Sequence, residues 1–175
     1  MTEHRTKIMG ILNVTVDSFS DGGKYLDTDS AVKHGIAMME QGADIIDVGG
    51  ESTRPGADRI SPEEEERRVL SVIETLVAEG ATVSIDTMNA STARAAIAAG
   101  AKIINDVSGG LADPEMFRVA AESGATLIIS HWRGFSDIMD TQNSYNDVAR
   151  DVTEELQVRV DAALAAGVSR DKLVI

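Results

Sequence analysis

The chain repeats one local pattern, in which a helical stretch ends at a Gly-Ala pair and a short apolar run follows within a few residues. The four pairs begin at Gly42, Gly80, Gly100 and Gly124. Glycine after a helix fits a left-handed cap, and an apolar run of four or five residues is typical of a strand covered on both faces. The pattern therefore restricts the chain to an α/β fold with a parallel sheet.

Six apolar runs are predicted to form strands, with helices between them. The strands occupy residues 8–14, 45–48, 83–85, 103–104, 127–129 and 173–175. The helices cover residues 28–39, 90–99 and 148–164, and two further helices begin at Ser61-Pro62 and at Asp113-Pro114. The segment Ser61-Pro62-Glu63-Glu64 has the form of a capping box with proline at the first helical position.

Polar residues follow each predicted strand, at the edge of a parallel sheet where ligands bind. They are Asn13, the segment 47–51, Asp86, Asn105 with Asp106, and His131. No Gly-x-Gly-x-x-Gly fingerprint follows the first strand, which disfavours a dinucleotide-binding fold. We predict an α/β fold of the (β/α)8 TIM-barrel type, with about five and a half βα units present. Residues 1–175 would form a single domain, truncated before its C-terminal strands; an open sheet is the alternative.

The composition excludes several partners and chemistries. The 175 residues carry a net charge of −13, which argues against nucleic acid and anionic membrane as partners, because both need a basic surface. There is no cysteine, so disulfides and thiolate chemistry are excluded. The first residues lack the apolar stretch of a signal peptide, and no segment approaches the roughly 20 apolar residues of a membrane span. We expect a soluble cytoplasmic protein.

The first predicted strand leads into a loop that combines charge with small residues. Asn13 ends the strand with a neutral oxygen ligand, and Asp17 and Asp21 add carboxylates. Gly22 and Gly23 leave this segment free to move. The loop therefore places charge, mobility and an open edge of the sheet together.

Four further side chains could act on a ligand at the same edge. Asp86 is either a cap on the next helix or a carboxylate that accepts two parallel N–H donors from a flat heterocycle. Asn105 is either a turn residue or an amide that reads the same ring. Arg54 is either a solvated charge or a fork for a carboxylate or phosphate. His131 is either a general base or a hydrogen-bonded supporting residue.

Five segments together resemble the dihydropteroate synthase family of folate biosynthesis. They are MGILNVTVDSFSDGG, GADIIDVGGESTRPGA, VSIDT, INDVSGG and SHWR. The first two are long and specific, and the resemblance covers the chain after residue 7. It implies a (β/α)8 barrel that joins 4-aminobenzoate to 6-hydroxymethyl-7,8-dihydropterin diphosphate, which yields 7,8-dihydropteroate and pyrophosphate.

The resemblance also implies roles for residues at the strand ends. Asn13 would help to hold Mg²⁺ on the diphosphate, and Asp86 and Asn105 would bind the pterin ring. Asp86 would stabilise the positive charge that develops as pyrophosphate leaves, so it is an expected catalytic residue. Ser130, which stands where the family usually has Met, and His131 are expected to support the site from a second layer.

Two loops are implied to complete the site. The loop with Phe19 and Asp21 would fold over it, together with the loop of Thr53, Arg54 and Pro55. These loops would form the 4-aminobenzoate pocket, where sulfonamides also bind. Asp21 and Arg54 are the expected catalytic residues of the two loops.

The family continues beyond the position of Ile175 with further pterin- and phosphate-binding residues and with its dimer contacts. We therefore expect the 175 residues alone to be inactive and the intact protein to be a homodimer. Two alternatives stay open. One is a pterin-binding barrel of the methyltransferase type, and the other is a non-catalytic half-barrel fragment.

Overall fold

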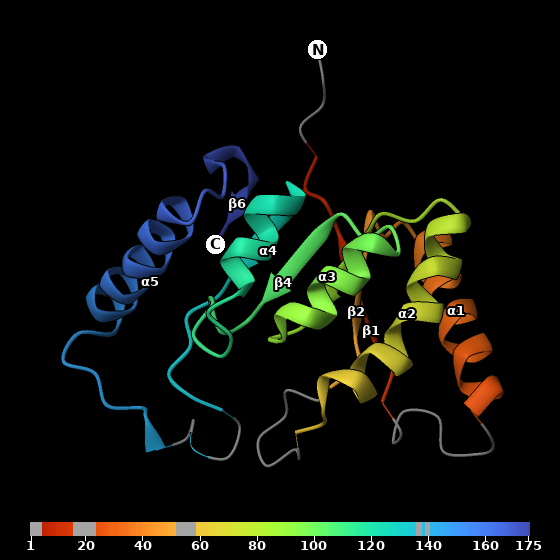
Figure 1. The fold of residues 1–175 in the computed structure, drawn as a ribbon, viewed down its shortest axis with the longest axis horizontal. Helices are drawn as coiled ribbons and strands as arrows, with labels where there is room; N and C mark the ends of the chain where they lie inside the picture. The colour runs from red at the N-terminus through yellow and green to blue at the C-terminus, as the bar shows by residue number, and fades with distance from the viewer. Residues whose placement is uncertain (1–4, 16–23, 52–58, 136–137, 139–140) are drawn as a thin grey trace.

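The computed structural model describes residues 5–15, 24–51, 59–135, 138 and 141–175, along which strands and helices alternate (Figure 1). The strands are β1 (Met9–Asn13), β2 (Ile45–Gly49), β3 (Val83–Asp86), β4 (Ile103–Asp106), β5 (Thr126–Ile129) and β6 (Leu173–Val174). They form a parallel sheet in the order β1-β2-β3-β4-β5-β6. This confirms the predicted α/β fold, since consecutive parallel strands in chain order are how a (β/α)8 barrel is built.

Every predicted helix is present, although the first one begins at Lys24 and not at the predicted residue 28. They are α1 (Lys24–Glu40), α2 (Pro62–Ala78), α3 (Ala90–Ala98), α4 (Met116–Ser123) and α5 (Val148–Ala165), and the 3-10 turn η3 (Arg170–Lys172) precedes β6. The glycines of the four Gly-Ala pairs have φ between 66° and 110°, so the left-handed turns are confirmed. The capping box is confirmed too, because the backbone N–H of Glu64 donates to Ser61 Oγ at 3.3 Å.

The predicted start of the fourth helix is also wrong. The fourth helix begins at Met116 and not at Asp113-Pro114. The Asp113 carboxylate accepts the backbone N–H of Ala90 at 2.9 Å, at the start of α3, and the N–H of Glu115 at 3.0 Å. Asp113 therefore satisfies an N-terminal N–H of the neighbouring helix as well as its own turn.

The two faces of the sheet differ in character. One face packs against the helices through apolar side chains that are less than 2% exposed, namely Leu12, Ile46, Val48, Ile85, Ile104, Leu127 and Ile129. The other face carries Ile11, which is 66% exposed. Alternate residues of a strand point to opposite faces, so Asn13, Asp86 and Asn105 lie on the face away from the helices. In a closed barrel this face is the interior.

The strands share one direction, so their carboxyl ends meet at one edge of the sheet. β1 descends from the upper part of Figure 1, and residues 141–147, which precede α5, lie in the lower part of that view. Among the described residues, none of the helices combines the length and the apolar character needed to cross a membrane.

Candidate functional site

Three of the predicted side chains stand in one row across the carboxyl edge of the sheet. Asn13 pairs with Gly49, Gly49 pairs with Asp86, and Asp86 pairs with Asn105, each on the next parallel strand. Partners in a parallel register point to the same face, so this rim row (Asn13, Gly49, Asp86 and Asn105) presents its side chains to one space. The structure therefore brings together residues that lie up to about 90 positions apart in the chain.

Gly49 lies between two of the oxygens of the rim row. A Cβ atom added at Gly49 would lie 3.4 Å from Asp86 Oδ2 and 3.5 Å from Asn13 Oδ1. The carboxylate of Asp86 and the amide oxygen of Asn13 therefore face the same space above Gly49. Neither side chain accepts or donates a hydrogen bond among the described residues, so both are available to a ligand.

Asn105 is oriented by the buried carboxylate of Asp47, which belongs to the polar segment predicted at the end of the second strand. Its Nδ2 donates to Asp47 Oδ2 at 2.9 Å, across 58 positions of the chain. Asp47 is only 4% exposed. It lies on the same face of the sheet as the rim row, two residues before Gly49 on β2. Burial raises the pKa of Asp47, while the Ser84 and Asn105 side chains lower it. A carboxylate inside the apolar run of β2 was the available sequence signal.

Asp86 titrates in an unusual range. Burial, and then the negative charges of Asp47, Glu65, Asp106 and Glu51, raise its pKa from 3.8 to about 7. Near neutral pH this carboxyl therefore exists in both forms. Carboxyl groups with a strongly raised pKa are typical of functional sites. In its ionised form, such a group can accept two parallel hydrogen bonds from a heterocycle.

Asp106 does not join this site, although it directly follows Asn105. It is completely buried and accepts hydrogen bonds from Ser108 N at 2.9 Å, Ser108 Oγ at 2.7 Å and Gly110 N at 2.6 Å. Its side chain points to the helix-covered face and holds the loop after β4. The polar pair at the end of β4 thus divides into one residue of the rim row and one structural residue.

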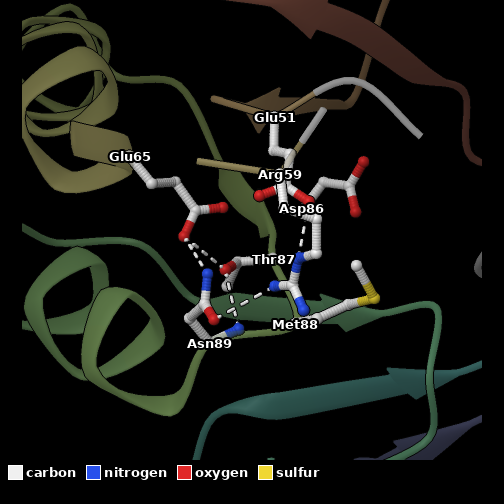
Figure 2. Close-up of a pocket in the computed structure, with 7 residues that line it drawn as sticks. All are labelled: Glu51, Arg59, Glu65, Asp86, Thr87, Met88 and Asn89. Carbon is white, nitrogen blue, oxygen red and sulfur yellow. Dashed lines mark hydrogen bonds and ion pairs between the residues drawn. The ribbon is translucent and has the colours of Figure 1, made fainter. Parts of the chain in front are cut away.

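Next to Asp86, a network of polar side chains lines a small cavity (Figure 2). The cavity there has a volume of about 10 Å³, room for one water molecule, and is lined by Glu51, Arg59, Glu65, Asp86, Thr87, Met88 and Asn89. Arg59 Nε donates to Glu51 Oε1 at 3.2 Å, and its Nη2 donates to Asn89 Oδ1 at 3.4 Å. The Arg59 guanidinium also lies 4.5 Å from the centre of the Phe135 ring. Arg59 is not predictable from the sequence, because only contacts between distant segments distinguish it from a solvated arginine.

His131 lies in a separate hydrogen-bonded group on the β5 side. Its Nε2 is 2.7 Å from Glu155 Oε2, and Arg133 binds both oxygens of the same carboxylate, at 3.1 and 2.5 Å. Hydrogen bonds from Arg133 and then His131 lower the pKa of Glu155 to about 2. This arrangement favours the supporting interpretation of His131 over that of a general base. Ser130 follows β5 and is half-buried.

The remaining predicted site residues, Phe19, Asp21, Thr53, Arg54 and Pro55, lie outside the described residues. Among the residues that are described, no cluster of three or more His, Asp or Glu side chains could hold a metal ion by itself.

Comparison with known proteins shows the family to which the chain belongs. The family model of pterin binding enzymes matches residues 9–175. The dihydropteroate synthase of Mycobacterium leprae is 52% identical over 170 residues, which cover 97% of this chain and 60% of the relative. The chain thus spans about 60% of the length of this curated relative.

Two solved structures resemble the fold closely. Xanthomonas albilineans dihydropteroate synthase with 4-aminobenzoic acid has a TM-score of 0.88 and 43% identity, over 97% of this chain and 60% of that one. Yersinia pestis dihydropteroate synthase in a sulfonamide drug complex has a TM-score of 0.88 and 39% identity, over 97% and 62%. With the family model matching nearly its whole length and with a rim row of amide and carboxyl groups, the chain belongs to the pterin-binding enzyme family.

Proposed function

We propose that the chain carries the pterin-binding part of a dihydropteroate synthase, which joins 4-aminobenzoate to 6-hydroxymethyl-7,8-dihydropterin diphosphate and releases pyrophosphate. The observation that carries the proposal is the convergence of Asn13 Oδ1 and Asp86 Oδ2 above Gly49. The relatives named dihydropteroate synthase support the choice of reaction.

The rim row suits a flat, nitrogen-rich ring. The ionised carboxylate of Asp86 can accept two parallel N–H donors from the amino-pyrimidinone edge of a pterin. Asn105, whose Nδ2 is held by Asp47, leaves its amide oxygen for a further N–H donor. Gly49 contributes no side chain, so the ring can approach the backbone of β2.

The same groups suit the chemistry. The C–O bond to the diphosphate breaks, the ring shares the positive charge left on its methylene carbon, and the amine nitrogen of 4-aminobenzoate forms the new C–N bond and loses a proton. The ionised carboxylate of Asp86 provides the negative potential that stabilises this cation. No activated serine or cysteine is needed, because the aromatic amine is already a nucleophile.

We propose that Mg²⁺ binds next to Asn13. Mg²⁺ prefers oxygen ligands and is usually bound by one or two protein groups together with substrate phosphates and water. Asn13 Oδ1, exposed at the end of β1, would be such a ligand, with the diphosphate supplying others. When bound, the ion would neutralise the departing pyrophosphate.

Ligand titration tests the proposal. We expect the chain to bind 6-hydroxymethylpterin, followed by the fluorescence of the pterin, and expect Asp86→Ala to weaken binding by more than about tenfold. The exposed Asp29→Ala is the matched control and should bind like the unchanged chain. Absence of pterin binding by the unchanged chain would contradict the proposal.

Competition separates the synthase from a pterin-binding methyltransferase. A synthase should bind 4-aminobenzoate and sulfonamides in competition with each other, as the sulfonamide complex of the Yersinia pestis relative suggests. A methyl-transfer protein should be indifferent to both. A cytoplasmic location and a homodimeric assembly are further parts of the proposal, and light scattering tests the second.

A further inference from the structure

Glu65, on helix α2, has a buried side chain whose carboxyl group points toward the turn that follows Asp86 in the chain (Figure 2). Its side chain is 1% exposed. Its Oε2 accepts hydrogen bonds from Thr87 Oγ1 and from Asn89 Nδ2, both at 2.9 Å. Glu65 therefore binds the side chains of the first and third residues after Asp86, without reaching the open face of the rim row.

The local environment gives Glu65 no stabilising cation. Among the described residues, none forms an ion pair with Glu65, and Arg59 pairs with Glu51 instead. The adjacent Glu64 forms ion pairs with both nearby arginines of α2. Removing a carboxylate from water without an ionic partner costs stability, and the neighbouring core positions of the helix, Val69 and Val72, are apolar. Stability alone does not explain an acid at this position.

The network fixes the orientation of the turn from both sides. Asn89 donates its backbone N–H to Thr87 Oγ1 at 3.0 Å and its Nδ2 to Glu65. With Nδ2 turned inward, Asn89 Oδ1 faces outward and accepts from Arg59 Nη2 at 3.4 Å. The orientation of the Asn89 amide thus follows from the acceptor at Glu65, and it determines how the loop before α2 is attached at Arg59.

The direction in which the Asp86 carboxyl group points depends on this turn. Its carboxylate accepts no hydrogen bond from any residue that the structure describes, so its direction depends on the backbone of β3 and of the following turn. Resting on the proposed function, we propose that Glu65 is a positioning residue for pterin binding: by holding Thr87 and Asn89 it fixes the turn that directs the Asp86 carboxylate at the ring.

Two substitutions of Glu65 separate positioning from bulk structure. Glu65→Gln keeps an oxygen that can accept both hydrogen bonds, so we expect the affinity of the chain for 6-hydroxymethylpterin to stay within about twofold. Glu65→Leu keeps the size but removes the acceptor, so we expect affinity to fall by about tenfold or more, as for other small misplacements of a binding group. Glu74→Gln, an exposed acid on the same helix, is the matched control and should change nothing.

Thermal unfolding is measured beside affinity for every variant. The proposal predicts that affinity follows the hydrogen bonds and not the midpoint of unfolding, so Glu65→Gln rescues binding whatever its Tm. Thr87→Val, which removes one donor from the network with little change of shape, should weaken binding severalfold and serves if Glu65→Leu fails to fold.

The outcomes distinguish this inference from the proposed function. If the unchanged chain binds no pterin, the proposed function and the inference both fail. If the unchanged chain binds pterin and Glu65→Leu and Thr87→Val bind as tightly, the inference alone is overturned. It is also overturned if affinity falls in parallel with Tm across all the variants, because Glu65 would then have only a structural role.

Discussion

Gly49 and Asp86 are the two residues on which the site depends most directly. The space between Asn13 Oδ1 and Asp86 Oδ2 exists because position 49 has no side chain. Gly50, the next residue, has a different role, since a Cβ there would lie 2.8 Å from Val69 Cγ1 and 3.0 Å from Glu65 Cγ. In the proposed site, Gly49 thus leaves room for a ligand, whereas Gly50 leaves room for the core.

Substituting these neighbouring glycines should separate binding from stability. Gly49→Ala puts a methyl group in ordinary contact with Asn13 and Asp86, so we expect affinity for 6-hydroxymethylpterin to fall about tenfold or more while Tm stays unchanged. Gly50→Ala overpacks the core and should lower the free energy of unfolding by about 1–3 kcal/mol. Affinity measurements and thermal unfolding of both variants test this, and equal pterin affinity in Gly49→Ala would show that the ligand does not use this space.

Asp86 should make stability depend on pH. Its pKa is about 7 in the folded chain and near 3.8 when unfolded, so between these values the folded state binds more protons than the unfolded state. Stability contributed by the protonated carboxyl is present below about pH 4 and is lost as pH rises toward about 7. We expect Asp86→Asn to raise the free energy of unfolding at pH 8, by the order of a few kcal/mol, and to raise it progressively less toward pH 4.

Denaturant unfolding at several pH values measures this difference, with the exposed Asp29→Asn as the control. A pH-independent difference between Asp86→Asn and the unchanged chain would show that Asp86 has an ordinary pKa. The same variant should bind pterin poorly, because a neutral amide cannot accept two parallel N–H donors. The charge that serves binding would therefore reduce stability.

At the scale of elements, the segment after β5 is organised around one arginine. Arg133 binds Glu155 on α5 with both ends of its fork, donates to the carbonyl oxygens of Gln142 at 3.3 Å and Ser144 at 2.7 Å, and lies 3.8 Å from the centre of the Tyr145 ring. No pattern in the sequence indicates these contacts, because they join a strand end to carbonyl groups about ten positions away.

Arg133→Lys should loosen this segment while leaving the sheet intact. A lysine cannot form the planar fork or the stacked contact, so we expect faster amide hydrogen exchange between residues 141 and 147 and a small change in Tm. Arg150→Lys is the control, because Arg150 is an exposed partner of Glu154 within α5. Unchanged exchange in Arg133→Lys would mean that the segment is held by other contacts.

The strands and helices can be predicted from local sequence. The contacts between them are harder to predict. Gly-Ala pairs and apolar runs predict the strands and helices because caps and buried strands are local features. The start of α4 is wrong because Asp113 is used by the neighbouring helix through Ala90, a contact that local sequence does not contain. For the same reason, local sequence does not predict the hydrogen bonds between Asn105 and Asp47 and between Thr87 and Glu65.

At the scale of the whole molecule, one parallel register accounts for the site. Because neighbouring strands are aligned at their carboxyl ends, Asn13, Asp86 and Asn105 meet on the open face without any long loop to bring them together. Their identity as strand-end residues was readable from the sequence. Whether a strand-end side chain faces the ligand or the helices was not, as the opposite orientations of Asn105 and Asp106 show.

A crystal structure of the chain with 6-hydroxymethylpterin bound tests the proposed pterin site directly. We expect the amino edge of the ring on the Asp86 carboxylate, the Asn105 side chain on the same ring, and the hydroxymethyl group directed toward Asn13. A ring bound elsewhere, with Asn13 and Asp86 directed away from it, would contradict the proposed site.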